Sequence, residues 1–207
     1  MSKLHPAQIV DEALSIMTAD GEAALAMRPL AARLGVTPMA LYRYFADRDA
    51  LLVALVERVS QNITLPEPRP EPVDSAVELA LCLHDFLTEY PWLIRLISTG
   101  RLASPAGMQF PEGFLACAAQ AGLDDAQAFV FYRTMFATIL GQATMSHAQA
   151  ETSEIRIPDL TVGPPVPAVS ALAPRWSELA ATASPRAVFQ AVAAALAAPE
   201  TPPRSAH

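Results

Sequence analysis

Apolar residues recur every three or four positions along most of this chain, which is the spacing of one face of an α-helix. A first helix is expected from Pro6 to about Asp20, where Gly21 provides a C-terminal stop signal. A later helix is expected from about Arg48, with Asp47 as its N-cap. The fold class predicted from this periodicity is all-α.

Four prolines at alternate positions interrupt the pattern in residues 65–73, LPEPRPEPV. Proline lacks a backbone N–H and clashes inside a helix, so this stretch predicts an extended, fairly stiff boundary. We therefore divide the chain into a head with its connecting helix (residues 1–64), a larger helical domain (65–198) and a disordered tail (199–207).

Helical periodicity returns beyond the boundary. The sequence predicts helices at about 74–90, 92–99, 111–121, 125–148, 174–179 and 185–198. Residues 149–173 lose the periodicity and gather prolines, so they are interpreted as a long connection whose order is left open.

The longest predicted helix, Asp125 to about Ala148, is apolar on two sides. One side carries Phe129, Tyr132, Phe136, Leu140 and Ala143, and the nearly opposite side carries Phe131, Met135, Thr138 and Met145. A helix that is apolar on two sides is buried on two sides. We expect one side to meet the protein's own core and the other a second subunit.

The stretch Leu30–Phe45, LAARLGVTPMALYRYF, contains a turn signal between two short helical patterns. Gly35 tolerates a positive φ after the first helix, Thr37 is a good N-cap, and Pro38 suits the first position of the second helix. This second helix is expected over Met39–Tyr44, and the free N–H groups at its start attract phosphate. These features are typical of a DNA-contacting helix-turn-helix.

Charge supports this interpretation locally but not globally. The 207 residues carry a net charge of −7, which argues against a protein that coats nucleic acid non-specifically. The window 27–48 nevertheless holds four arginines against one acid: Arg28, Arg33, Arg43 and Arg48 against Asp47. This basic face is suited to specific contact with DNA.

The lengths of the apolar runs and the number of cysteines indicate in which cellular compartment the protein is expected. No apolar run approaches the roughly 20 residues of a membrane span, and the N-terminus MSKLHPAQ lacks the apolar core of a signal peptide. Two cysteines, Cys82 and Cys117, are too few for a disulfide framework. We expect a cytoplasmic protein with reduced thiols, and leave a redox role for Cys82 open.

With its flanking residues the motif reads RPLAARLGVTPMALYRYFADRDALL, and it resembles the signature of the tetracycline-repressor (TetR) family of bacterial regulators. The resemblance is detailed from about Ile9 to Val59 and architectural beyond. It implies an N-terminal three-helix helix-turn-helix head and a C-terminal helical ligand-binding and dimerisation domain. The family's DNA contacts correspond here to Arg28, Thr37, Pro38, Met39, Ala40, Tyr42, Arg43, Tyr44 and Arg48.

These positions divide by expected role. Met39, Ala40 and Arg43 are expected to face base edges, and the phosphate contacts are expected at Thr37, Tyr42, Tyr44 and Arg48. The family often has His at Tyr44 and Lys at Arg48, so its operator preferences do not transfer. The alternative is that Tyr42 and Phe45 are core aromatics and the arginines a solvated face.

The resemblance also implies double-stranded operator DNA, a small-molecule effector and a second copy of the chain as partners. Dimerisation is assigned to Asp125–Ala148 and Pro185–Ala198, by analogy with the family's four-helix bundle. An apolar and aromatic lining, which favours a hydrophobic effector, is expected from His84, Leu87, Trp92, Leu96, Phe131, Met135, Phe136 and Trp176. The alternative is that these residues are ordinary core side chains, and that His84 is buried with a hydrogen bond to a carbonyl group.

The preferred function is a repressor that a hydrophobic effector releases from a near-palindromic operator. The alternatives are a small-molecule-binding enzyme with an incidental head, and a helical adaptor that binds protein. The sequence has no phosphate-binding glycine loop, no metal-ligand spacing and no Ser-His-Asp pattern. We therefore expect no catalytic residue, no cofactor and no metal site.

Overall fold

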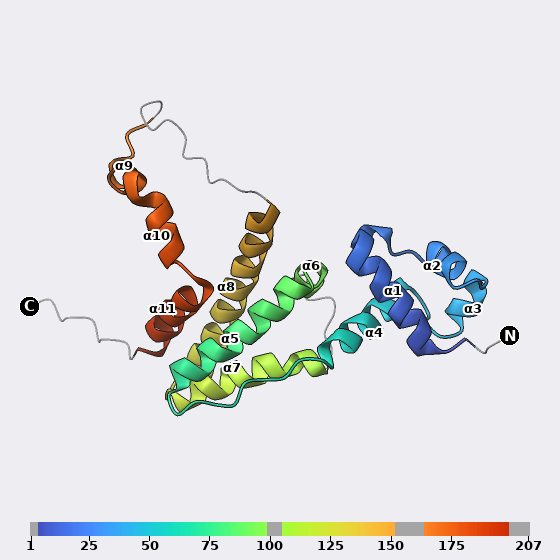
Figure 1. Cartoon of the computed structure of the whole chain (residues 1–207). Coiled ribbons are helices and arrows are strands. Elements are labelled where there is room, and N and C mark those ends of the chain that lie inside the picture. The colour runs from blue at the N-terminus through green and yellow to red at the C-terminus, as the bar shows by residue number, and fades with distance from the viewer. Residues whose placement is uncertain (1–3, 99–104, 152–163, 199–207) are drawn as a thin grey trace, which may run out of the picture.

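The computed structural model of the chain describes residues 4–98, 105–151 and 164–198, and every regular element among them is helical (Figure 1). The helices are α1 (Pro6–Asp20), α2 (Met27–Arg33), α3 (Pro38–Tyr42), α4 (Arg48–Ser60), α5 (Pro72–Glu89), α6 (Trp92–Ser98), α7 (Gln109–Gln120), α8 (Asp125–Glu151), α9 (Pro167–Leu172), α10 (Trp176–Thr182) and α11 (Pro185–Ala197). Three 3₁₀ turns accompany them: η1 (Glu22–Ala24), η2 (Ala106–Met108) and η3 (Ala173–Arg175). The all-α prediction is confirmed.

Helices α1 to α4 form the head. Helix α1 packs against η1, α2 and α4, and α2 packs against α3. Its core consists of fully buried aliphatic side chains from each helix, among them Ile9, Leu30, Leu41 and Leu55. As predicted, α1 begins at Pro6 and ends at Gly21, whose φ of 77° closes the helix.

Helix α5 is the centre of the larger domain, because it packs against α7, α8 and α11. In Figure 1, α5, α7 and α8 lie side by side, and α4 connects them to the head. Large buried side chains hold these helices together, including Phe114 from α7, Phe131 from α8 and Phe189 from α11. The hydrophobic effect of burying such aromatic groups is the main stabilising contribution to this domain.

Several helix boundaries differ from the sequence-based expectation. Helix α5 begins at Pro72 rather than at Asp74 or Ser75, because the Ser75 hydroxyl bonds the backbone of Arg69 instead of capping the helix. Helix α7 begins at Gln109 rather than Pro111. Helix α3 covers Pro38–Tyr42 rather than Met39–Tyr44.

The stretch interpreted as a long connection is partly helical. Helix α8 continues to Glu151, and α9 lies within residues 149–173, where Pro167 supplies the fixed φ that suits a first helical turn. Residues 152–163, like the tail 199–207, lie outside the described residues. In Figure 1, α9 and α10 project away from α5 and α7.

Helix α8 shows two different sides within one protomer. Phe131, Met135, Ile139 and Ala143 are buried against the domain core, and Phe129, Val130 and Met145 are 58%, 55% and 54% exposed. The sequence placed Ala143 on the side opposite Phe131, but Ala143 follows Ile139 by one helical turn and shares its buried side. The sequence placed Met145 on the same side as Phe131, but Met145 is exposed. One apolar side is therefore packed and another is open.

Among the described residues, no single helix is long and apolar enough to cross a membrane. The segments Pro167–Thr182 and Pro185–Ala197 reach the required length and composition only as a pair, which is bent by 88°.

The turn between α2 and α3 depends on Gly35, whose φ is 66° and whose surroundings would leave an added Cβ without an atom within 4 Å. Gly35→Ala should therefore lose about 1–2 kcal/mol of unfolding free energy through backbone strain alone. Gly35→Asn should lose less, because Asn tolerates the left-handed region. Urea unfolding of both variants measures this difference, and an unchanged stability of Gly35→Ala would contradict it.

Candidate DNA interface and effector cavity

The turn Leu34–Thr37 fixes the angle between α2 and α3 through its backbone. The N–H of Gly35 donates to the carbonyl of Ala32, and the N–H of Val36 donates to Ala31. Thr37 precedes α3 with extended backbone angles, as expected of an N-cap, but its hydroxyl makes no capping hydrogen bond. Leu41, fully buried, anchors α3 in the head.

The outer side of α3 is exposed. Met39 is 72% exposed and Tyr42 is 47% exposed, and Thr37 and Arg43 are also open to solvent. Pro38 and Ala40 are partly exposed. The exposure of Tyr42 argues against its being a core aromatic, whereas the half-buried Phe45 packs against the head core.

The four arginines of the basic face have different surroundings. Arg33 donates from Nε to Glu12 Oε1 at 2.6 Å, and Arg48 bonds several groups of the head. Arg28 and Arg43 are exposed and make no hydrogen bond or ion pair with any described residue. These two guanidinium groups keep all their donors for an external partner.

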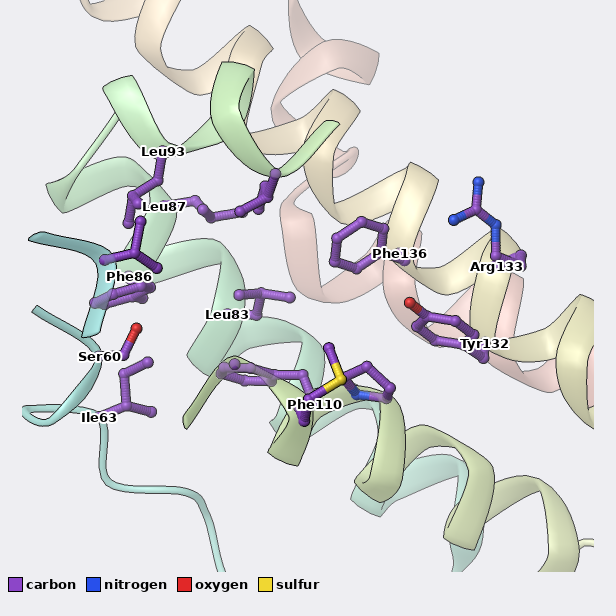
Figure 2. Close-up of a pocket in the computed structure, with 15 residues that line it drawn as sticks. Ser60, Ile63, Leu83, Phe86, Leu87, Leu93, Phe110, Tyr132, Arg133 and Phe136 are labelled. Carbon is purple, nitrogen blue, oxygen red and sulfur yellow. The ribbon is translucent and has the colours of Figure 1, made fainter. Parts of the chain in front are cut away.

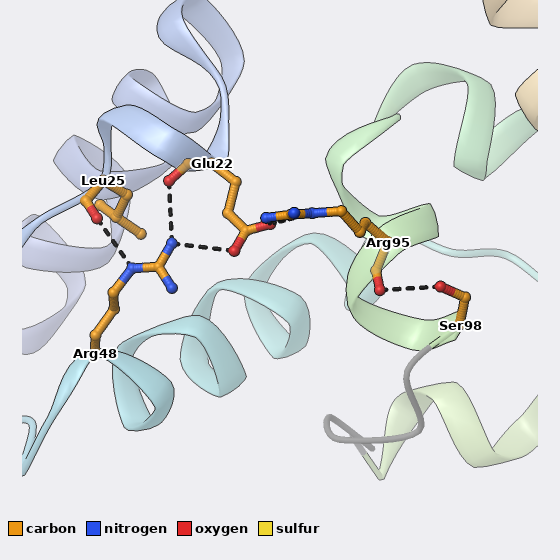
Figure 3. Close-up of polar contacts among 5 residues, drawn as sticks. All are labelled: Glu22, Leu25, Arg48, Arg95 and Ser98. Atoms are coloured by element: carbon orange, nitrogen blue, oxygen red, sulfur yellow. Dashed lines mark hydrogen bonds and ion pairs between the residues drawn. The ribbon is translucent and has the colours of Figure 1, made fainter.

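Tyr44 and Arg48 already have partners inside the head. The Tyr44 hydroxyl donates to the carbonyl of Leu4 at 2.7 Å. Arg48 donates from Nε to the carbonyl of Leu25 and from Nη2 to both the carbonyl and the carboxylate of Glu22, at 3.0–3.1 Å (Figure 3). Both residues therefore brace the head, and their phosphate contacts stay predictions.

Glu22 joins the head to the larger domain. Its Oε2 accepts hydrogen bonds from Nε and Nη2 of Arg95 in α6, at 3.1 and 2.8 Å, and its Oε1 accepts from Arg48 (Figure 3). Its side chain is only 13% exposed. Burial raises the pKa of Glu22, but the hydrogen bonds and charges of Arg95 and Arg48 outweigh burial and hold that pKa below its ordinary value.

A cavity of about 250 Å³ lies between the end of α4 and the helices of the larger domain (Figure 2). Aliphatic and aromatic side chains dominate its wall. The lining residues are Val56, Ser60, Ile63, Leu83, Phe86, Leu87, Leu93, Ile97, Gly107, Met108, Phe110, Pro111, Tyr132, Arg133 and Phe136. A partly open, mainly apolar cavity of this kind is a common form of small-molecule site.

Two of the eight residues expected to line the effector site, Leu87 and Phe136, line this cavity. Phe131, Met135 and Leu96 do not, because they are buried in helix packing. Trp92 lies in a shallower depression between head and larger domain, and Trp176 starts α10. Helical spacing identified these side chains as apolar but not which of them border empty space.

His84 is buried in the larger domain but does not line the cavity. Its Nδ1 lies 3.0 Å from Oδ1 of Asp85, its Nε2 lies 3.2 Å from Oγ of Ser146, and its ring meets that of Phe189 edge-on at 6.0 Å. His84 therefore joins α5 to α8 and α11 with both ring nitrogens in use, and a serine takes the place of the expected carbonyl partner.

Helices α4 and α7 contribute cavity residues that the sequence did not predict. Val56, Ser60 and Ile63 come from the end of α4 and the residues after it, and Phe110 comes from α7. Ser60 had a recognisable signal, since it follows Val56 by four residues and so places a hydroxyl on an apolar face. No sequence signal predicted the contact between Glu22 and Arg95, because 73 residues separate them.

Neither cysteine has the surroundings of a reactive thiol. Burial raises the pKa of Cys82, and the charge of Asp85 raises it further; burial also raises the pKa of Cys117. Within the described part of the chain there is no group of three or more His, Cys, Asp or Glu side chains that could hold a metal ion.

Solved structures share the arrangement of head and larger domain. A crystal structure of BioQ with its natural double-stranded DNA operator aligns with a TM-score of 0.62 at 28% identity, covering 72% of this chain and 92% of that one. ActR from Streptomyces coelicolor in complex with actinorhodin aligns with a TM-score of 0.71 at 24% identity, covering 96% and 100%. The likeness to ActR concerns the fold.

Curated relatives are similar over shorter stretches. A "HTH-type transcriptional regulator" of Saccharopolyspora erythraea is 32% identical over 116 residues, which are 56% of this chain and 49% of the relative. The class A tetracycline repressor from transposon 1721 of Escherichia coli is 40% identical over 72 residues, 34% of this chain and 33% of the relative. The chain thus spans about half the length, or less, of these relatives.

Two family profiles match consecutive parts of the chain. Residues 9–55 match the bacterial regulatory proteins of the tetR family, and residues 68–166 match the tetracyclin repressor-like C-terminal domain. A family of transcriptional regulators accounts for both the head and the larger domain, so the enzyme and adaptor alternatives are set aside. The chain belongs to the TetR family of DNA-binding transcriptional regulators.

Proposed function

We propose that this regulator represses transcription by occupying a near-palindromic operator as a homodimer, and that a small, largely hydrophobic effector in the cavity releases it. The observation that carries this proposal is the position of α4. Arg48 at its start is bonded to the head, while Val56 and Ser60 near its end line the cavity. An occupant of the cavity therefore contacts the helix that carries the head.

DNA recognition is assigned to the exposed side of α2 and α3. Met39, Ala40 and Arg43 face base edges in the major groove, where an Arg pairs with guanine and apolar groups meet a thymine methyl. Arg28, Thr37 and Tyr42 hold phosphates. The absence of internal partners for Arg28 and Arg43 among the described residues supports this division. Because its operator lies on bacterial DNA, the protein acts in the cytoplasm.

Dimerisation is assigned to α8 and α11, which pack against each other in the protomer. The open side of α8 carries Val130 and Met145 together with small residues, including Ala137, Gly141 and Thr144. The outer side of α11 is rich in alanine. Small side chains allow close approach of helices, and a second copy would cover the exposed apolar groups. The two heads would then read the two halves of a symmetric operator.

Coupling between cavity and head follows two routes. Helix α4 is the first, and α6 is the second, because α6 presents Leu93 and Ile97 to the cavity and Arg95 to Glu22 of the head. Linkage requires the effector to bind the DNA-free geometry more tightly than the DNA-bound one. A loss of operator affinity of about 100-fold corresponds to a coupling free energy of only about 2.7 kcal/mol.

The DNA interface is tested on the DNA upstream of the protein's own gene, at fixed salt concentration. Arg43→Ala should weaken operator binding by about 5- to 150-fold, the value of one bidentate base contact, and adding Tyr42→Phe should weaken it further. Arg58→Ala is the control, because it removes the same charge from the head at a residue paired with Asp11. Unchanged affinity of the double variant would refute the proposed interface.

The dimer interface is tested with Gly141→Arg. Gly141 is exposed in the protomer and no atom lies within 4 Å of an added Cβ, so the protomer should fold normally. The Arg side chain should nevertheless block a helix that approaches α8, giving a monomer in analytical ultracentrifugation and weak operator binding. Ala119→Arg, on the exposed side of α7, should stay dimeric. A dimeric Gly141→Arg would exclude this face.

The link between head and larger domain is tested by Glu22→Gln and pH. The folded state lowers the pKa of Glu22, so its ionised form stabilises folding above the ordinary pKa of 4.5, and this contribution is lost as pH falls through the lowered value. The stability difference between wild type and Glu22→Gln should therefore be constant near neutral pH and shrink below about pH 4.5. Urea unfolding at a series of pH values measures it, and a pH-independent difference would contradict it.

A further inference from the structure

The wall of the cavity is apolar except for two hydroxyl groups, those of Ser60 and Tyr132, and for Arg133 at its rim. Ser60 is only 5% exposed, and its Oγ makes no hydrogen bond to any described residue. The ring of Tyr132 packs against Phe129 and Phe136, and its hydroxyl likewise has no partner in the described part of the chain. Both residues line the cavity, and in Figure 2 the Tyr132 hydroxyl points into it from the side opposite Ser60.

A hydroxyl that faces the cavity and bonds no protein group loses its hydrogen bonds with water when an apolar occupant fills the cavity, and that loss is energetically unfavourable. The apolar wall offers no partner: Leu83 and Phe110 lie between the two hydroxyls, and Phe86 lies beside Ser60. An occupant that displaces water from the cavity must therefore supply the hydrogen bonds of Ser60 and Tyr132. Such an occupant needs one polar group at each end and an apolar middle.

Arg133 is a weaker candidate for an anchor. Its side chain is exposed, and in Figure 2 its guanidinium group points away from the cavity. An exposed cation is hydrated and screened, so it contributes little to binding inside the cavity. The geometry therefore favours neutral hydrogen-bonding groups over an acidic group.

We propose that the effector is a neutral aromatic compound of at least two rings with a hydroxyl or carbonyl group at each end, one bonded by Ser60 and the other by Tyr132. This inference rests on the proposed effector cavity. Its volume of about 250 Å³ exceeds the roughly 150 Å³ of a cavity that binds benzene, which leaves room for a second ring. Because Ser60 is the last residue of α4, one of these hydrogen bonds joins the effector to the helix that carries the head.

The test uses the full-length protein and four probes of one shape: naphthalene, naphthol, dihydroxynaphthalene with its hydroxyls at opposite ends, and naphthoate. Calorimetric titration should show affinity rising about fivefold with each hydroxyl. Ser60→Ala and Tyr132→Phe each remove one hydroxyl and keep the packing. Each substitution should weaken the binding of dihydroxynaphthalene about fivefold and leave the affinity for naphthalene unchanged.

Matched controls make the same atomic changes away from the cavity: Ser177→Ala on α10 and Tyr90→Phe after α5 should bind all four probes as the wild type does. Thermal unfolding shows whether the variants fold. Ser60→Ala should be about as stable as the wild type, since the hydroxyl that it removes makes no hydrogen bond to a described residue.

Two results would overturn the inference while leaving the cavity as the effector site. One is equal affinity for naphthalene and dihydroxynaphthalene. The other is tightest binding of naphthoate, with that advantage lost in Arg133→Gln and kept in Ser60→Ala, which would make the anchor a charge. Failure of all four probes to bind would overturn the effector cavity itself as well as this inference.

Discussion

The carboxylate of Glu22 is the group on which the relation between the two parts of the molecule depends. It accepts hydrogen bonds from Arg48, which holds the start of α4 to the head, and from Arg95, which belongs to a helix of the cavity wall. A nearly buried carboxylate between two guanidinium groups is well satisfied, whereas loss of that carboxylate would leave Arg48 without its ionic partner. The head is thus held to the larger domain by a charge cluster as well as by the covalent connection through α4.

This cluster gives the arginines of the head two distinct roles. Arg33 and Arg48 bond other groups of the head, whereas Arg28 and Arg43 are exposed and bond no described residue. The sequence presents all four as one basic face, because charge counting does not distinguish a paired guanidinium from an unpaired one. The net positive surface offered to DNA is therefore smaller and more localised than composition suggests.

Sequence patterns predicted the parts of the fold that depend on local chemistry. Helix α1, the Gly35 turn, the Asp47 cap and the long α8 follow from capping residues, a left-handed glycine and helical periodicity. The cavity was predicted poorly, because the empty space arises where side chains of α4, α5, α6, α7 and α8 meet without filling the volume between them. Periodicity tells which side chains face inward, but Met135 and Phe136 are adjacent and only the latter borders the cavity.

The pairing of Glu22 with Arg95 also limits how freely the parts of such a regulator can be exchanged. The two residues are 73 positions apart, one in the head and the other in the larger domain. A head transplanted onto another larger domain would keep its own core, yet Glu22 would lose its partner Arg95 unless an arginine stood at the matching place in α6. In the proposed function the first 64 residues supply the contacts with the operator and α8 and α11 supply the dimer. The response to an effector depends on the pairing of head and larger domain, so the two parts would have to be inherited together.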